Sequence, residues 1–186
     1  VGAALDDDLG AASGSAYLMD LRQFEVPPGD EAWGVRSAMV SAGFFEEMQV
    51  NWPVAVPANQ PVWFAPFTSV VRGLSCVLMA TVGGQPCTVQ VDADAPAMLH
   101  VSDGATLTLV DVNVERASSH PTVWDAARQS TAPAVVVSPT ERAGRLDVYG
   151  GTFTAAPVHV VGAFASCSLN RATFVRCHTL LSGGAL

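Results

Sequence analysis

The stretch "GRLDVYGGTFTAA", residues 144–156, decides the fold, because the chain contains its pattern three times. The blocks "ATLTLVDVNVERA" (105–117) and "ASCSLNRATFVRC" (165–177) align with it without gaps. Their apolar or small positions coincide: Leu107, Leu109, Val112 and Val114 align with Leu146, Val148, Gly151 and Phe153, and with Cys167, Leu169, Ala172 and Phe174. Such self-similarity is the signature of a repeat architecture.

The spacing of the blocks suggests the kind of repeat. The last two blocks are 21 residues apart and the first two are 39 apart; the 18 extra residues fit a polar, proline-bounded insertion at 117–133. A further short strand pattern accompanies the blocks at 98–101, 134–137 and 158–161. A unit of about 21 residues with two or three short strands is about one coil of a parallel β-helix, whose inward residues stack into a continuous core. A β-sandwich is the alternative, since regular short strands fit it too.

Two-residue steps interrupt the apolar pattern between Leu109 and Val112, and again between Val148 and Gly151. We expect the coil to turn a corner there. The glycine pairs at 83–84 and 150–151 are typical of tight turns or close-packed corners that need a small residue.

One helix is expected before the coils. Asp30 is a candidate N-cap, Glu31 a favourable first-turn acid, and Gly43 a C-terminal stop. Helical spacing puts four apolar residues on one face: Ala32, Val35, Met39 and Ala42. The expected organisation is an N-terminal extension at 1–29, a capping helix at 30–43 and β-helix coils at 44–186.

The chain from about residue 30 onward resembles a known family through this order of elements, the F-x-x-C step at 174–177 and the GGAL tetrapeptide at 183–186. It looks like the N-terminal part of a right-handed parallel β-helix of the pectin-lyase-like superfamily. More narrowly, it is similar to large extracellular β-helix proteins of green algae and to polymorphic-outer-membrane-protein repeats. The resemblance implies a helix that caps the first coil, and we expect the other end to continue into further coils or to meet a neighbour.

Charge and hydropathy exclude several classes of partner. The net charge is −8, with nine arginines and no lysine. The chain therefore has few basic residues with which to form a surface that binds a phosphate backbone, and nucleic acid is not an expected partner. No apolar run approaches the length of a membrane span.

The four cysteines form two close pairs in the sequence, Cys76 with Cys87 and Cys167 with Cys177. An even number at short spacing is typical of a disulfide-bonded extracellular chain, and zinc-site spacing is missing. We expect a bridge at least between Cys76 and Cys87. The alternative is that the four are buried free thiols, because cysteine is also a common core residue.

Catalytic and metal-binding patterns are weak. Asp92 and Asp94 share one face of a strand and Asp103 lies at the next turn, so they are weak candidates for a calcium site, although a polar outward face is the simpler interpretation. The chain has no G-x-S-x-G nucleophile elbow, P-loop or G-x-G-x-x-G motif. We therefore expect no enzyme and no cofactor, with calcium as the only candidate.

Other residue types fit surfaces or packing. His100 and His159 occupy matching places, so we expect them on one outward ladder, whereas His120 and His178 are isolated. A set of aromatic residues is expected to pack the helix onto the first coil: Trp52, Trp63, Phe64 and Phe67. Trp124 and Arg128 in the polar insertion are the candidates for a partner contact.

The functional expectation is a non-enzymatic structural or adhesive module. It would lie outside the cell or on its surface, in a surface, cell-wall or ciliary assembly, and would act through lateral and end-to-end contacts with other proteins. The alternative is a β-helix that binds or cleaves polysaccharide with calcium, and a third is a trimeric fibre segment of a phage or virus.

Overall fold

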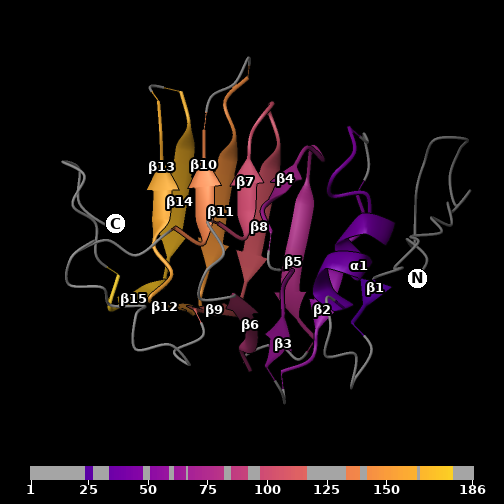
Figure 1. Cartoon of the computed structure of the whole chain (residues 1–186), viewed down its shortest axis with the longest axis vertical. Coiled ribbons are helices and arrows are strands. Elements are labelled where there is room, and N and C mark those ends of the chain that lie inside the picture. Colours follow the sequence, from indigo (N-terminus) through magenta and orange to yellow (C-terminus); the bar gives the residue numbers. More distant parts are fainter. Residues whose placement is uncertain are drawn as a thin grey trace, which may run out of the picture.

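The fold is a parallel β-helix, as the repeats predict. A computed structural model describes residues 24–26, 34–47, 51–58, 61–65, 67–81, 85–91, 97–116, 133–138, 142–162 and 164–177. Their strands form three sheets, and every pair of neighbouring described strands is parallel (Figure 1). The β-sandwich alternative is wrong, because a sandwich is built from antiparallel sheets.

Each complete coil of the solenoid contributes one strand to each of the three sheets. Sheet A contains, in spatial order, β1 (Phe24–Glu25), β2 (Val54–Val56), β5 (Cys76–Ala80), β8 (Thr106–Val110), β11 (Arg145–Tyr149) and β14 (Ser166–Asn170). Sheet B contains β3 (Val62–Trp63), β6 (Cys87–Val91), β9 (Val112–Arg116), β12 (Thr152–Thr154) and β15 (Thr173–Val175). Sheet C contains β4 (Ser69–Val71), β7 (Leu99–Val101), β10 (Val135–Val137) and β13 (Val158–Val160).

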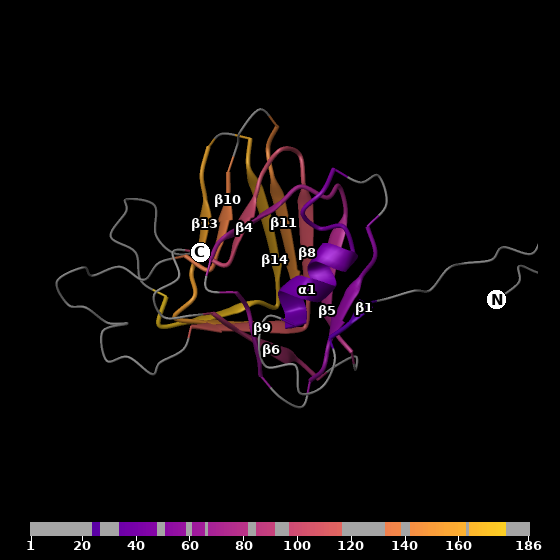
Figure 2. The same ribbon diagram turned by 45° about the vertical axis from the view of Figure 1, so that its right-hand side comes forward.

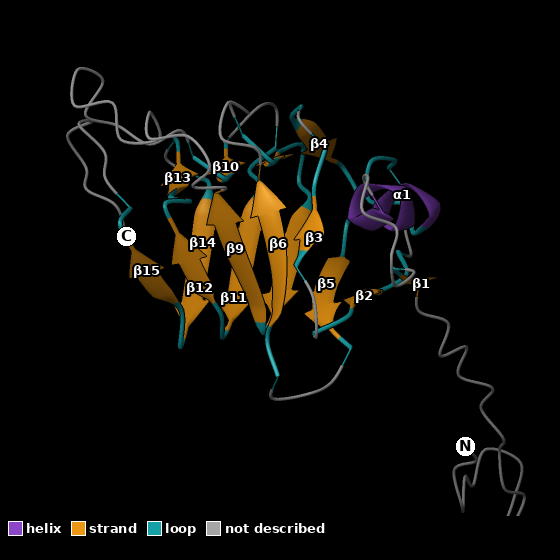
Figure 3. Ribbon diagram, turned by 60° about the horizontal axis from the view of Figure 1, so that its bottom comes forward, coloured by secondary structure: helices purple, strands orange, loops and turns teal. Residues whose placement is uncertain are grey.

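These strands define five coils, which we number in chain order. Coil 1 is β2–β3–β4, coil 2 is β5–β6–β7, coil 3 is β8–β9–β10 and coil 4 is β11–β12–β13, while β14 and β15 belong to coil 5. Figure 3 shows the strands of sheet B side by side, with the helix at the end where the lowest-numbered strands lie.

The register between coils is the one that the internal repeats predict. Leu146 pairs with Leu107 on one side and Cys167 on the other, and Phe153 pairs with Val114 and Phe174. The rings of Phe153 and Phe174 stack with centroids 5.0 Å apart. Equivalent inward residues therefore lie directly above one another.

One ladder of inward side chains runs through all five coils and the strand before them: Phe24, Val54, Leu78, Leu109, Val148 and Leu169. The four central members are at most 1% exposed. Burying each such side chain contributes roughly 1.5–3 kcal/mol, so these ladders are the main source of stability.

The corner between sheets A and B repeats a left-handed backbone. Asp111, Gly150 and Arg171 occupy the same position in coils 3, 4 and 5, with φ of 52°, 77° and 56°. The interstrand hydrogen bonds continue through it, since the Asp111 N–H donates to the Tyr149 carbonyl and the Gly150 N–H to the Asn170 carbonyl, both at 2.8 Å. The predicted two-residue corner is confirmed.

The helix α1 (Gly34–Ser41) packs against β1, β2 and β3 at the start of the solenoid (Figure 2). The predicted inward residues Val35, Met39 and Ala42 are fully buried. Gly43, with φ of 80°, ends the helix: its N–H donates to the Val40 carbonyl, and the Phe44 N–H donates to the Met39 carbonyl. This is a Schellman motif, so the predicted stop is confirmed. Asp30, Glu31 and Ala32 lie outside the described residues.

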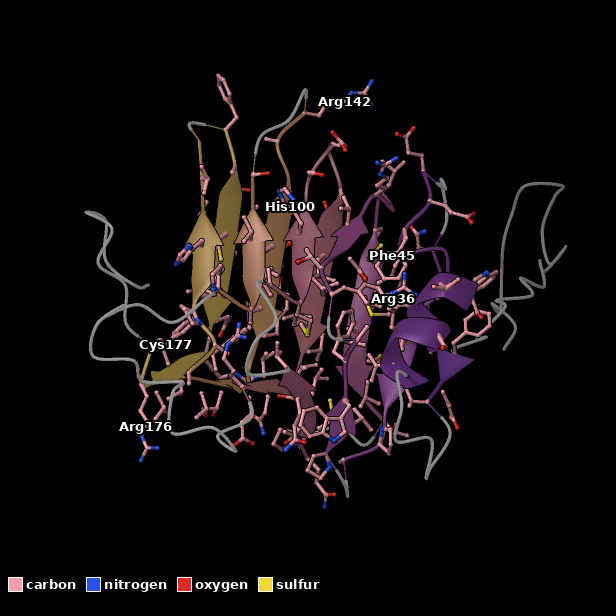
Figure 4. All side chains as sticks on the ribbon, in the orientation of Figure 1. Arg36, Phe45, His100, Arg142, Arg176 and Cys177 are labelled. Carbon is pink, nitrogen blue, oxygen red and sulfur yellow. The ribbon has the colours of Figure 1, made fainter. Side chains whose placement is uncertain are left out.

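Arg36 connects the helix to sheet C. Its guanidinium carbon lies 5.3 Å from the ring centroid of Phe45 (Figure 4). The same carbon lies 4.8 Å from the ring centroid of Phe67, and the Arg36 Nε donates to the Ser69 hydroxyl at 3.0 Å. The contact with Phe67 and the hydrogen bond to Ser69 thus hold the helix against the first coil, and the contact with Phe45 holds it to the segment that follows the helix.

The aromatic residues expected under the helix divide between packing and surface. Phe64 is 2% exposed and Trp52 packs partly buried against the core. Trp63 points outward from β3 and is 38% exposed. Phe67 is 40% exposed but contacts Arg36, so packing explains three of the four.

Gly151 should be the least replaceable residue of the A–B corner. A Cβ built there lies 2.1 Å from the Val112 carbonyl oxygen, and its φ is 97°. We expect Gly151→Ala to lower the free energy of unfolding by about 3 kcal/mol or more, because strain and a backbone clash add.

Gly104→Ala is the matched control for that variant. Its φ is 81°, but the nearest atoms to a built Cβ lie at 3.4 Å, so only the left-handed backbone is penalised, by about 1–2 kcal/mol. Denaturant unfolding measures both variants, and equal losses would contradict the stacking constraint.

Candidate functional site

The candidate site lies along the row of corners that lead from sheet C to sheet A. These corners follow β4, β7, β10 and β13, one for each of coils 1 to 4. We call this row the C–A edge; it lies along the upper side of the molecule in Figure 1. Successive corners touch, since the Gly104 N–H donates to the Arg142 carbonyl at 3.2 Å.

A groove of about 380 Å³ opens on this edge. Its lining includes Glu47, Arg72, Leu74, Asp103 and Arg142. Arg72 and Leu74 come from the corner after coil 1, and Asp103 comes from the corner after coil 2. Arg142 comes from the corner after coil 3, at the upper side of the molecule in Figure 4. Along the edge, the groove residues Arg72, Asp103 and Arg142 therefore alternate in sign.

Asp103 is held by a tight turn. Asp103 and Gly104 have φ of 57° and 81°, and the Ala105 N–H donates to the Ser102 carbonyl at 2.9 Å. Positive φ at both central residues characterises a type I′ turn, which the Asp-Gly pair favours. The Ser102 hydroxyl also donates to the Asp103 carboxylate at 3.2 Å, so backbone and side chain are both positioned.

The two arginines of the groove are exposed, and neither side chain forms a hydrogen bond or ion pair with another described residue. They differ from Arg145, whose Nε donates to both carboxylate oxygens of Asp147 at 2.8 and 3.0 Å. The groove therefore offers two guanidinium groups to an incoming partner.

An exposed apolar corner continues the edge. Phe164, between β13 and β14, is 82% exposed, and Val161 beside it in the same corner is 52% exposed. Phe164 is the most exposed of the large hydrophobic side chains in the described part of the chain.

The histidines lie on an outward ladder of sheet C, as predicted. The ladder is Val70, His100, Val136 and His159 in coil order, so a valine separates the two imidazoles. His100 Nε2 is hydrogen-bonded to the Ser138 hydroxyl. Burial lowers the pKa of His159, which favours its neutral form. His120 and His178 lie outside the described residues.

Metal binding finds no support in the described residues, among which no three His, Cys, Asp or Glu side chains are grouped to hold a metal ion. Asp103 is described, but Asp92 and Asp94 lie outside the described residues. Trp124 and Arg128 also lie outside them, so the structure does not place the predicted partner contact.

The disulfide prediction is wrong, because all four cysteines are free thiols. Cys76 begins a strand of sheet A and stacks on Leu107, whereas Cys87 begins a strand of sheet B and stacks on Val112. Cys167 stacks on Leu146, and the Cys177 thiol donates to the Phe153 carbonyl at 3.3 Å. Free thiols were the alternative interpretation: Cys76 and Cys87 are buried in the core, whereas Cys167 and Cys177 pack partly buried against it.

Burial raises the pKa of Cys76 and of Cys87 to about 12. The pKa values of Cys167 and Cys177, in the last described coil, are also raised by burial, but both residues are only half-buried. The thiolate is the reactive form, so all four are poor nucleophiles.

Comparison with known proteins gives no relative: no family model, curated protein or solved structure matches the chain significantly. No helix in the described part of the chain is long and apolar enough to cross a membrane. Fold and edge together define the class of the molecule as a parallel β-helix with a charged groove along one row of corners.

Thiol labelling should separate the two pairs of cysteines. At pH 8 we expect iodoacetamide to modify Cys167 and Cys177 slowly. It should leave Cys76 and Cys87 unmodified until the chain is unfolded, because Cys76 and Cys87 are fully buried. Peptide mass spectrometry measures each site. Native modification of Cys76 at the rate of an unfolded peptide would contradict the described packing.

Alkaline pH should destabilise the fold through the same two thiols. Their folded pKa of about 12 exceeds the ordinary value of 9.0, so above pH 9 the unfolded chain releases protons that the folded chain keeps. Stability is full below pH 9 and falls as pH rises toward 12. Denaturant midpoints between pH 8 and 11 should fall less steeply for the Cys76→Ala/Cys87→Ala variant than for the wild type.

Proposed function

We propose that this β-helix is a non-enzymatic structural or adhesive module that works through protein contacts on its sides and ends. The observation that carries the proposal is the in-register stack of three parallel sheets, which builds a stiff body with flat lateral faces and regularly spaced corners. Function in such a body belongs to the residues that project from it.

The chemistry of the described residues also supports a binding role. The groove combines two guanidinium groups with two carboxylates, and the apolar corner at Phe164 lies on the same edge. Charged and aromatic groups at a rigid surface are the means by which protein interfaces obtain specificity.

The proposal places the module outside the cell or on its surface, in a surface, cell-wall or ciliary assembly. Its support here is the resemblance of the 174–177 step and the GGAL tetrapeptide to extracellular β-helix repeats. The disulfides that pointed to the same location are not formed.

Deletion of residues 118–132, together with cross-linking mass spectrometry in cells that make the protein, tests the proposal. We expect cross-links from this insertion and from the lateral faces to other proteins, loss of the insertion's links in the deletion variant, and an unchanged melting temperature. Circular dichroism checks that the variant keeps its β-structure.

Two results would overturn the proposal. One is an absence of protein cross-links at the lateral faces. The other is calcium-dependent cleavage of polygalacturonate that disappears in the Asp92→Ala/Asp94→Ala variant, which would establish the polysaccharide-active alternative.

A further inference from the structure

The C–A edge is self-complementary when its order is reversed. Read from coil 1 to coil 4, the described residues of its corners include Arg72 with Leu74, then Asp103, then Arg142, then Phe164 with Val161. A twofold axis between coils 2 and 3 exchanges coil 1 with coil 4 and coil 2 with coil 3. Asp103 then faces Arg142 of a second copy, and the apolar corner of coil 4 faces the groove beside Leu74.

We propose that two copies of this chain associate along the C–A edge, with their solenoid axes antiparallel and a twofold axis between coils 2 and 3. The inference rests on the proposed function, because it names the partner of one lateral contact. Its occupant is a second copy rather than an unrelated protein, since Asp103 and Arg142 are opposite in charge and the apolar corner and the groove beside Leu74 lie at exchanged positions of the same edge. Isologous contacts of this kind are the commonest form of homo-oligomer.

The spacing of the coils makes the match geometrically possible. Neighbouring parallel strands lie about 4.8 Å apart, so the corners of coils 1 and 4 are separated by about 14 Å. When two such edges lie antiparallel, each corner of one edge still faces a corner of the other, because the spacing of the corners is the same. Each copy then contributes both members of the Asp103–Arg142 pair, which forms twice across the axis.

The apolar corner supplies the anchor. Phe164 is 82% exposed on one copy, and Leu74, 45% exposed, lines the groove of about 380 Å³ on the other. A phenyl ring in this groove would lie beside the guanidinium group of Arg72, a contact that aromatic rings favour. Aromatic residues seated in pockets commonly dominate the affinity of an interface.

Local complementarity is required because the chains repel each other at long range. Each carries a net charge of −8, so a non-specific side-by-side contact is unfavourable. Only an arrangement that brings Arg142 to a carboxylate, and removes exposed apolar surface, offsets this repulsion. The contact involves one edge alone, so we expect a dimer that dissociates on dilution.

Sedimentation velocity over a range of concentrations tests the dimer. We expect wild-type chain to shift from monomer to dimer as its concentration rises, and Phe164→Ser to raise the dissociation constant at least about tenfold. Tyr149→Ser is the matched control: Tyr149 is 41% exposed on the outer face of β11, away from the edge, and its loss should leave the dimer unchanged.

Charge reversal identifies the pairing. Asp103→Arg and Arg142→Asp should each be monomeric alone, because like charges then meet twice across the axis. An equimolar mixture should form a heterodimer, in which every pair is again opposite in charge. The Asp103→Arg variant should fold, since Arg171 and Arg176 already have φ of 56° and 54° in this chain; circular dichroism checks both variants.

A wild-type chain that stays monomeric, a dimer that Phe164→Ser leaves intact, or a mixture that fails to associate would overturn this inference. None of these results touches the proposed function, which depends on cross-links to other proteins. Conversely, a chain that dimerises as described but has no such cross-links would overturn the proposed function and leave the dimer standing.

Discussion

The register between coils is the constraint on which the rest of the structure depends. Parallel strands place equivalent residues side by side, so Leu78, Leu109 and Val148 form one continuous column. A slip of one residue would turn the inward side chains of a coil to the solvent. The register therefore has to be restored after every corner, whatever the length of the segment that intervenes.

Corners divide into two kinds under this constraint. The A–B corner of coils 3 to 5 is short and always left-handed, at Asp111, Gly150 and Arg171. The C–A corner is longer than these three, from four residues after β4 and β7 to seven after β10. The first kind maintains the register, whereas the second is free to carry Arg72, Asp103 and other groups that project from the body. Three charged residues of the groove, Arg72, Asp103 and Arg142, thus come from these longer corners.

The sequence predicted what repeats and missed what does not. Aligning three blocks located the inward ladder, the two-residue corner and the histidine ladder, because each follows from a periodic pattern. The disulfide prediction was wrong because nearness in sequence is misleading in a solenoid. Cys76 and Cys87 begin strands of different sheets, and each stacks on the coil after it rather than on the other.

The groove was not predicted for a related reason. Its arginines follow strands of coils 1 and 3, Asp103 lies between them, and Glu47 comes from the segment after the helix. No linear motif joins these positions, although a comparison of the corners, rather than the strands, would have shown that each of the first three carries charge. Once the strand register is known, the side chains of successive corners can be listed in order along the edge, with one corner for each coil. A second protein with the same spacing is complementary to this edge wherever groups of opposite charge face each other. An antiparallel second copy of the same edge is the simplest way to obtain this complementarity.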